Sequence, residues 1–480
     1  MNMNLTTTGI YDYDYVIVGA GPAGLTFAHL AAKEGKSVLI LEKNSSVGGC
    51  HRVDRVNGLF SEHGPRVISG AYKNFKEILK EMTLNFRDLY KKYHFSISSI
   101  GGNVITQLKP YELLKFTGAF LRLTWNHEYG RNISMEQFTR INSFTKESKD
   151  YLDRLCRLTD GAGSDRYSLN EFLELINQQW IYSLYQPKEP NDTGLFRLWT
   201  NYLLATGKVT IKLNEYVENI SKDPGGYFNV KSTSSSSWNS SWAARKVILA
   251  IPPVSLSYLV DGFSSYAEKS KYVQYISVSF HWNSKLTLPK VWGFPKTDYG
   301  LAFIVVSDYF FENPNTPTVI STAVTLTDSI SNVTGKTANE CEFTELTQEM
   351  LRQLRESFPN LPDPDAIVMS PSIKKVKGKW INEDTAFVKA ADVNYIPFEI
   401  SSAFPGLYTL GTHNGYSKYK FTSLESAVSN AIELHNRLHH GNGHGKLPVS
   451  GPFELTALIK IIVVALFVLV IVLGRVYVHF

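Results

Sequence analysis

The pattern of apolar and polar residues opens with a strand, a helix and a second strand. Tyr13–Val18 is a short apolar run, Ala23–Glu34 has the composition of a helix, and Ser37–Leu41 is a second apolar run that ends at Glu42. Apolar runs of about four to eight residues are typical of buried strands. The beginning of the chain therefore predicts a β-α-β unit within about 30 residues.

The pattern changes twice further along the chain. From Tyr72 to Thr206 it is mostly helical, and Ser168 with Glu171 forms a capping box at the start of one helix. Strands and helices then mix. Strands are predicted at Val209–Val230, Lys246–Ile251, Tyr275–Trp282 and Leu407–Leu410, and helices at Thr344–Phe358 and from about Ser423 to Leu438.

The C-terminal segment is the most apolar part of the chain. Ile461–Gly474 carries no charge, and Lys460 and Arg475 flank it. This uncharged run has 14 residues, whereas a membrane span needs about 20. Because the run is apolar on all sides and follows a linker rich in Gly, His and Pro, the sequence predicts a transmembrane anchor. The expected localisation is single-pass and tail-anchored, with the catalytic part in the cytosol.

Composition narrows the functional classes. The net charge of +5 is small for 480 residues, so no nucleic-acid partner is expected. The three cysteines, Cys50, Cys156 and Cys341, form no CxxC pair and indicate neither a disulfide framework nor a structural zinc site. His439, His440 and His444 fall in the linker, where no fixed element is expected to hold them. No metal site is therefore predicted.

The first candidate site is the glycine motif after the first strand, Gly19-Ala20-Gly21-Pro22-Ala23-Gly24. Gly19 permits a tight turn, Gly21 allows the backbone to approach a pyrophosphate, and Gly24 allows the helix to pack on the strand. The helix N-terminus offers amide N–H groups to the phosphates. Glu42, at the end of the second strand, can accept hydrogen bonds from a ribose and would repel a 2′-phosphate. The motif predicts a dinucleotide site that is not suited to NADP.

Further segments of the chain resemble those of a known protein superfamily. Lys43 to Gly49 (KNSSVGG), Gly58–Arg66, Lys246–Pro253 and Pro405–Ala431, with Gly194 and Val217, resemble segments of the flavin-dependent amine oxidase superfamily. That group includes protoporphyrinogen oxidases and UDP-galactopyranose mutases. The resemblance implies an α/β fold with a Rossmann-type FAD-binding domain and an inserted α+β substrate domain. FAD would be bound without a covalent link. The FAD domain would comprise residues 1–80, 205–255 and 400–440, the substrate domain 81–204 and 256–399, the linker 441–454 and the anchor 455–480.

The resemblance also implies residue roles. Arg66, Tyr416 and Lys420 are the candidate catalytic residues, because a cation near the reduced flavin stabilises its negative charge and an aromatic ring can line the substrate slot. His413 and Lys418 are further candidates beside the ring. The predicted cofactor-binding residues are Gly19, Gly21, Pro22, Ala23, Gly24, Glu42, Lys43, Gly48, Gly49, Arg66, Val217, Gly411, Thr412 and Ser423.

Some positions depart from the family pattern. Ser46 and Cys50 stand where many amine oxidases carry arginines, and Thr412-His413 stands where a small residue and an aspartate are common. The leading hypothesis is an FAD-dependent oxidoreductase that takes a hydride from a small organic substrate. Two alternatives stay open. One is a redox-neutral sugar-nucleotide mutase like UDP-galactopyranose mutase, and the other is a membrane flavoprotein without catalytic activity.

Overall fold

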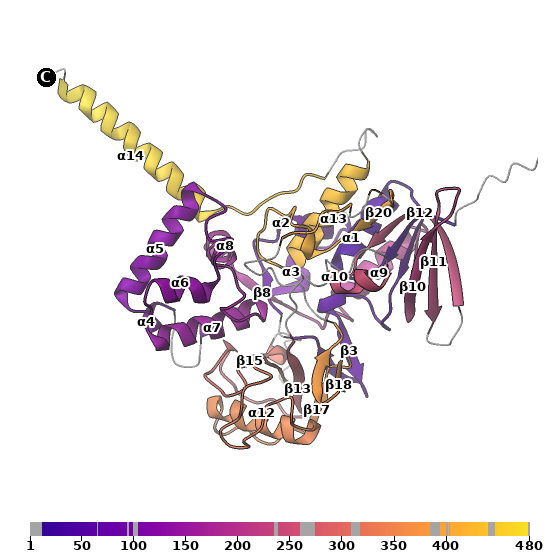
Figure 1. The fold of residues 1–480 in the computed structure, drawn as a ribbon, viewed down its shortest axis with the longest axis horizontal. Helices are drawn as coiled ribbons and strands as arrows, with labels where there is room; N and C mark the ends of the chain where they lie inside the picture. The colour runs from indigo at the N-terminus through magenta and orange to yellow at the C-terminus, as the bar shows by residue number, and fades with distance from the viewer. Residues whose placement is uncertain are drawn as a thin grey trace, which may run out of the picture.

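A computed structural model describes most of the chain. The described residues are 12–64, 66–93, 96–98, 104–234, 239–259, 274–308, 317–384, 394–399, 402, 404–439 and 447–478. Within them the chain has a mixed α/β fold with two large sheets and a group of helices beside them (Figure 1).

The first sheet carries the N-terminal β-α-β unit. It is formed by β10 (Glu215–Lys222), β11 (Phe228–Ser234), β12 (Asn239–Leu249), β1 (Tyr13–Val18), β2 (Val38–Leu41) and β9 (Val209–Lys212), with β20 (Leu407–Thr409) beside β12. Strands β20, β12, β1, β2 and β9 are parallel, whereas β10 and β11 form an antiparallel hairpin that joins β12. The carboxyl ends of the five parallel strands therefore meet at one edge.

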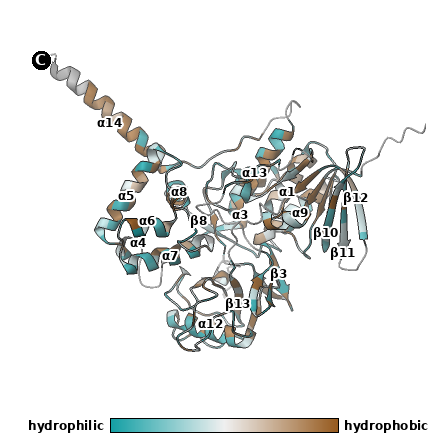
Figure 2. Ribbon diagram, in the orientation of Figure 1, coloured by the Kyte–Doolittle hydropathy of each residue, from teal (hydrophilic) through white to brown (hydrophobic). Residues whose placement is uncertain are grey.

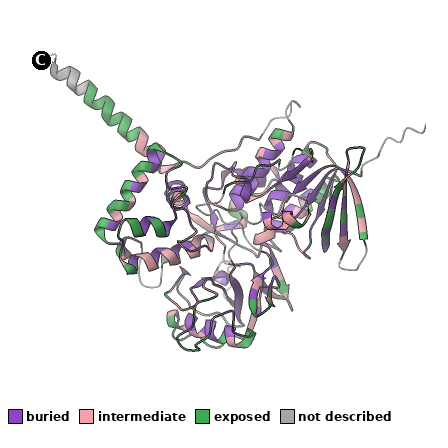
Figure 3. Ribbon diagram, viewed as in Figure 1, coloured by how far each residue is buried: buried purple, intermediate pink, exposed green. Residues whose placement is uncertain are grey.

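Helices cover the faces of this sheet (Figures 1 and 3). On one face α1 (Pro22–Lys33) packs against α13 (Leu424–Leu438), and α2 (Lys73–Glu81) and α9 (Leu195–Ala205) complete the layer. Residues 22 to 32 of α1 are all buried, so this helix lies at the centre of the core. On the other face, side chains of the β10–β11 hairpin and of α10 (Pro253–Leu259) pack against β1, β2 and β12 in a second core.

The second sheet lies below the first in Figure 1. Its strands, in order, are β17 (Ala366–Met369), β13 (Ile276–Trp282), β16 (Thr318–Val324), β15 (Leu301–Val305), β14 (Val291–Gly293) and β7 (Ser96–Ser98), and α12 (Phe343–Ser357) packs on one face. The strand predicted at Tyr275–Trp282 is confirmed as β13. Ile276, Val278, Phe280 and Trp282 join the α12 core, whereas Ser277 and His281 turn to the opposite face.

The helical part lies between the second sheet and α14. It contains α4 (Val104–Gln107), α5 (Pro110–Trp125), α6 (Met135–Ile141), α7 (Lys146–Asp160) and α8 (Leu169–Gln179), whereas the short α3 (Phe86–Leu89) lies beside α2 and β6. The predicted helix start at Ser168 is confirmed, because its Oγ accepts a hydrogen bond from Glu171 N at 3.1 Å. The Glu171 side chain instead accepts from Thr422, which ties α8 to the segment before α13.

Small elements connect these parts. The hairpin β3 (Val53–Val56)–β4 (Leu59–Glu62) follows the 3-10 turn Gly49–His51, and β5 (Ile68–Ser69), β8 (Leu184–Pro187) and β6 (Tyr90–Lys92) form a three-stranded sheet. A second hairpin consists of β18 (Ile373–Val376) and β19 (Lys379–Asn382), and further 3-10 turns span Val306–Asp308 and Thr412–Asn414.

The C-terminal helix corrects one expectation. Helix α14 (Leu455–Val478) packs by its first turn against α8 and then leaves the body, with apolar residues from Ile461 to Ile471 exposed (Figures 2 and 3). Among the residues that the structure describes, no helix has both the length and the apolarity that a membrane crossing requires. The predicted transmembrane anchor, the membrane partner and the tail-anchored localisation are therefore wrong, and the physical reason is that the uncharged run is shorter than the bilayer core is thick.

A buried carboxylate joins α13 to α2. Both Glu425 oxygens accept hydrogen bonds at the start of α2, from Asn74 N (2.9 Å), Asn74 Nδ2 (2.7 Å) and Phe75 N (2.9 Å). Burial raises the pKa of Glu425 to about 7. In the unfolded chain a glutamate titrates near pH ~4.3. The stability that Glu425 contributes is therefore present below that pH and is lost as the pH rises through about 7.

This titration gives a testable result. The free energy of unfolding of Glu425→Gln minus that of the wild type should be on the order of 2 kcal/mol larger at pH ~8 than at pH ~5. The reason is that glutamine does not ionise. Denaturant unfolding at the two pH values measures the difference. Glu433→Gln, on a partly exposed turn of the same helix, should show no such change. A Glu425→Gln difference that does not vary with pH would contradict the raised pKa.

Candidate functional site

The candidate site begins at the carboxyl edge of the first sheet. There Gly19 N donates to Leu41 O (2.8 Å), Ala250 N to Val18 O (2.8 Å) and Leu410 N to Leu249 O (2.9 Å). Ligands of open parallel sheets bind outside this edge. The ends of β1, β2, β12 and β20 therefore converge where the sequence predicts a dinucleotide.

Two glycines form the tight turn that the motif predicts. Gly19 has φ +101°, and a Cβ on it would lie 2.5 Å from Ala250 O. A Cβ on Gly24 would lie 2.2 Å from Gly19 O. Neither position has room for a side chain, so both glycines are required for the packing of α1 on β1.

The N-terminus of α1 faces a second pair of glycines. Gly21 is the N-cap of α1 and provides no side-chain cap, so the first-turn amides stay available to an anion. A Cβ on Gly21 would lie 3.7 Å from Gly49 Cα, and one on Gly49 would lie 3.1 Å from Gly21 Cα. Gly48 N donates to Ala20 O at 2.9 Å and holds the two loops together. The result is a cradle without side chains at a helix N-terminus, which suits a pyrophosphate.

Glu42 lies beside this cradle at the end of β2. Its Oε2 accepts from Ala20 N (2.8 Å), and its Oε1 accepts from Asn44 N (3.0 Å) and Asn44 Nδ2 (2.8 Å). Burial raises the pKa of Glu42. Val217, the predicted adenine contact, is buried in β10 at an irregularity of the β10–β11 ladder.

A buried ion-pair network behind the glycine loop has no counterpart in the sequence analysis. The Arg52 guanidinium binds Asp54 (2.9 Å) and Asp384 (2.6 Å), and Lys43 Nζ lies 3.0 Å from Asp384. Burial alone would raise the pKa of Asp384, but the nearby Arg52 and Lys43 cations lower it to about 2. Lys43, a predicted cofactor residue, is therefore paired with a carboxylate far along the chain.

The segment Glu62–Arg66 leaves β4 under the polar face of the second sheet. Ser277 Oγ donates to His63 O, and His281 Nε2 donates to Phe60 O at 2.8 Å. The serines of β13 and β16 are small, so β4 approaches this face closely. The second sheet thereby fixes the backbone that carries Arg66.

Arg66 lies among buried groups with unused polar atoms. Its Nη2 donates to Tyr275 OH at 3.4 Å, while Arg66 Nε, Glu62 Oε1 and His63 Nε2 are buried and have no hydrogen-bond partner among the described residues. Burial and the Arg66 charge lower the pKa of His51 to about 3. Burial raises the pKa of Glu62 to about 7. Buried polar atoms without partners are costly, so this cluster fits contact with a polar ring such as a flavin.

The C-terminal motif runs from the end of β20 to the start of α13. Gly411 follows β20, and Thr412 begins the next 3-10 turn. Gly411 N donates to Asn414 Oδ1 (2.8 Å), and Asn430 Nδ2 of α13 donates to Gly411 O (2.7 Å). Ser423 Oγ accepts from Ser426 N at 3.3 Å and caps α13, which begins where a helix was predicted. Tyr72 lies close to Ser423, and the Arg66 charge acts on it. Arg66 and the start of α13 therefore face a common region.

The other ring-side candidates do not join Arg66. The Tyr416 ring stacks on Phe398 at 4.4 Å between centroids, and Arg437 lies 4.0 Å above it. Lys418 and Lys420 are exposed, whereas Tyr419 between them is buried beside Tyr72. His413 is buried, and burial lowers its pKa to about 3.

Sequence reasoning missed several residues of this region. Glu62 and His63 are adjacent to Arg66 in the quoted motif, so their position was the available signal. Tyr72 and Tyr275 carry no motif, and Tyr419 lies in the quoted Pro405–Ala431 segment without having been singled out; the fold brings these tyrosines near Arg66 and Ser423.

Comparisons with known proteins agree with this geometry. The family model for flavin containing amine oxidoreductases matches residues 22–371. A probable flavin-containing monoamine oxidase A of Dictyostelium discoideum is 23% identical over 50% of this chain and 58% of its own length. UDP-galactopyranose mutase of Mycoplasma pneumoniae is 41% identical, but over only 12% of this chain and 15% of its own. These matches thus span well under two thirds of the two curated relatives.

A solved structure of putrescine oxidase bound to putrescine has a similar fold. Its TM-score is 0.64 at 15% sequence identity, with 89% of this chain and 98% of that chain covered. At this identity the likeness concerns the fold alone.

Proposed function

Since the chain belongs to the flavin containing amine oxidoreductase family, we propose that it is an FAD-dependent oxidoreductase that takes a hydride from a small organic substrate. The observation that carries the proposal is the Gly21–Gly49 cradle at the N-terminus of α1, with the buried Arg66 charge acting on Cys50 and His51, which directly follow Gly49. The match to the mutase covers too little of either chain to favour that alternative.

The dinucleotide is proposed to extend along the carboxyl edge of the first sheet. Glu42 and Val217 contact the adenosine end, and Gly21, Gly49 and the α1 amides bind the pyrophosphate. The ring then lies between Arg66 and the N-terminus of α13, close to Gly411, Thr412 and Ser423. The cofactor domain in this proposal comprises residues 1–80, 205–255 and 400–440, and the intervening segments form the substrate domain.

The chain's own residues define the electrostatics of the ring site. When bound, the flavin accepts the hydride and becomes negatively charged near N1 and O2. Arg66 is the buried cation of the cluster, because burial lowers the pKa of both His51 and His63 and keeps them neutral. The α13 N-terminus adds about 0.3–1 kcal/mol of stabilisation, or more when buried. Burial raises the pKa of the Cys50 thiol, which therefore stays protonated and does not attack the cofactor.

Anaerobic reduction of the bound cofactor tests the proposed reaction. The holoprotein is mixed with amines, tetrapyrroles, isoprenoids and nucleotide sugars, and loss of the oxidised flavin absorbance is followed. An oxidoreductase should be reduced by one class and turn over again when air is admitted. A mutase would require prior reduction and show no net oxidation. If no compound reduces the flavin and reduced protein converts no nucleotide sugar, the catalytic proposal fails.

Arg66→Ala should lower the flavin reduction potential and slow reduction at least about tenfold, while FAD stays bound. The reason is loss of a buried charge that favours the anionic reduced state, and tenfold corresponds to about 1.4 kcal/mol. A redox titration together with flavin content measures both effects. Lys420→Ala is the matched comparison, and its effect should be weaker because Lys420 is exposed. An unchanged potential in Arg66→Ala would remove this residue from the ring site.

A further inference from the structure

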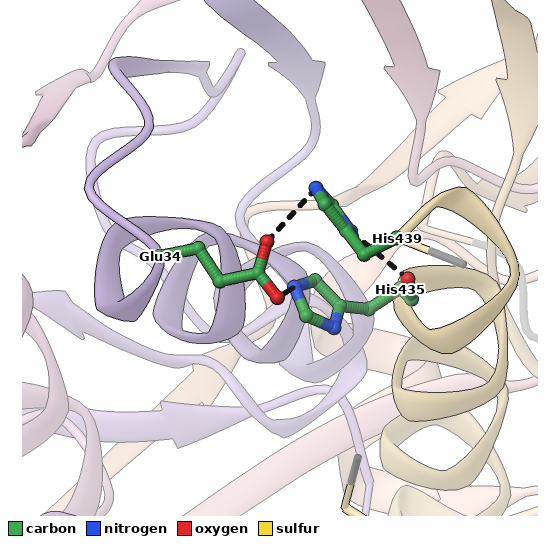
Figure 4. A group of neighbouring side chains, drawn as sticks. All are labelled: Glu34, His435 and His439. Atoms are coloured by element: carbon green, nitrogen blue, oxygen red, sulfur yellow. Dashed lines mark hydrogen bonds and ion pairs between the residues drawn. The ribbon is translucent and has the colours of Figure 1, made fainter. Parts of the chain in front are cut away.

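Three potential ligands meet at the far end of α1 from the cradle. Glu34 directly follows α1, His435 lies in the last turn of α13, and His439 caps the C-terminus of α13. Figure 4 shows their side chains pointing toward one another across the α1–α13 contact. The twelve residues of α1 separate this group from the pyrophosphate cradle by about 18 Å, so it is distinct from the proposed flavin site.

The spacing of the polar atoms fits a metal ion. His435 Nε2 lies 3.4 Å from Glu34 Oε1, and His439 Nε2 lies 3.1 Å from Glu34 Oε2. The three ligand atoms all lie within 4.8 Å of one another. Zinc binds nitrogen and carboxylate oxygen at about 2.0–2.2 Å, so two ligands of a tetrahedral site are about 3.4 Å apart. The two histidine–carboxylate distances are close to this value, and each runs to a different oxygen of Glu34.

The ring nitrogens that face Glu34 are the Nε2 atoms of the two histidines. His439 Nδ1 donates to His435 O at 3.0 Å, because a carbonyl oxygen only accepts, and this leaves Nε2, which also contacts the Tyr15 hydroxyl, as the ligand atom of His439. Metal-binding histidines commonly donate their other N–H to a carbonyl in this way. His435 is 7% exposed, and its Nε2 has no hydrogen-bond partner among the described residues.

We propose that Glu34, His435 and His439 bind one divalent transition-metal ion, with zinc as the preferred ion and a water molecule in the fourth position. A carboxylate with two imidazoles is a donor set that suits zinc. Tyr15 OH, 3.2 Å from His439 Nε2, borders the site. The sequence predicted no metal here, because His439 was assigned to a linker without a fixed element, whereas the structure places it at the C-terminal cap of α13. The ion would join the N-terminal β-α-β unit to the last helix of the same core.

Zinc binding to the full-length, untagged holoprotein tests the proposal. After removal of metals with a chelator, the protein is dialysed against a zinc salt and its bound zinc is measured. The wild type should retain one zinc per chain, and zinc should raise the Tm while the flavin content is unchanged. His435→Ala and His439→Ala should each lose the bound zinc and the Tm response, and Glu34→Gln should weaken binding at least tenfold.

Controls separate this site from other histidines. The double variant His440→Ala, His444→Ala changes linker residues that lie outside the described residues, and it should bind zinc like the wild type. If His435→Ala does not fold, as judged by its flavin content, His439→Gln replaces it in the zinc measurement, because His439 is partly exposed and its substitution disturbs the core less. The proposal is overturned if the wild type retains no zinc, or if the His439 variants retain as much as the wild type. In the first case Glu34 and His439 form only an ion pair.

Discussion

Gly21→Val is expected to give a folded protein that no longer holds flavin. Gly21 has φ −75° and ψ 175°, a conformation that valine also adopts, and the nearest atom to an added Cβ is Gly49 Cα at 3.7 Å. The protein alone therefore tolerates the side chain. The methyl groups would instead occupy the space between the two glycines where the pyrophosphate is proposed to lie. Affinity for FAD should fall at least about 100-fold, or about 2.7 kcal/mol.

Flavin absorbance per chain, with circular dichroism as the check on folding, measures this effect. Gly118→Val is the control, because Gly118 lies on the exposed side of α5 with no atom within 4 Å of an added Cβ. It should keep its flavin. Full flavin occupancy in Gly21→Val would mean that the cradle does not bind the pyrophosphate.

Arg52→Ala should lower the free energy of unfolding by about 3–5 kcal/mol. The Arg52 side chain is 6% exposed and binds both Asp54 and Asp384, which are themselves largely buried. Its removal leaves two carboxylates in a poorly solvated place, with only Lys43 remaining as a partner of Asp384. The loop that carries Gly48 and Gly49 immediately precedes Arg52, so flavin affinity should fall as well.

Arg55→Ala on the same hairpin is the matched control. Arg55 makes two hydrogen bonds to Asp192, but its side chain is 37% exposed. Exposed ion pairs contribute about 0–1 kcal/mol. Denaturant unfolding of the two variants with saturating FAD compares the pairs directly. Equal losses would show that burial does not distinguish them.

Local sequence signals predicted the elements whose residues lie close together in the chain. The β-α-β unit and its glycines follow from short-range periodicity and from turn chemistry, as does the capped start of α8 at Ser168. The same reasoning failed for α14, where apolar composition was given more weight than the short length of the uncharged run. Length was the more informative of the two signals.

Residues that depend on distant partners could not be predicted. Tyr416 was expected in the substrate slot, but nothing in the local sequence indicates that Phe398 and Arg437 pack against its ring. Lys420 directly follows the buried Tyr419 and is exposed. The sequence alone does not show which of these two neighbouring side chains faces the core. The i,i+4 spacing of His435 and His439 is apparent in the sequence, yet their third neighbour, Glu34, comes from the other end of the chain.

The packing of α13 on α1 also has a consequence for biosynthesis. Helix α1 is synthesised early, but α13 and β20, which cover it and extend its sheet, follow only after about 390 further residues. At roughly 5–20 residues per second the ribosome needs about 20 to 80 s for that stretch. During this time the apolar surface of α1 that α13 later covers is exposed on the nascent chain. The protein therefore has a long interval in which chaperones can bind it, and chains truncated before α13 should aggregate.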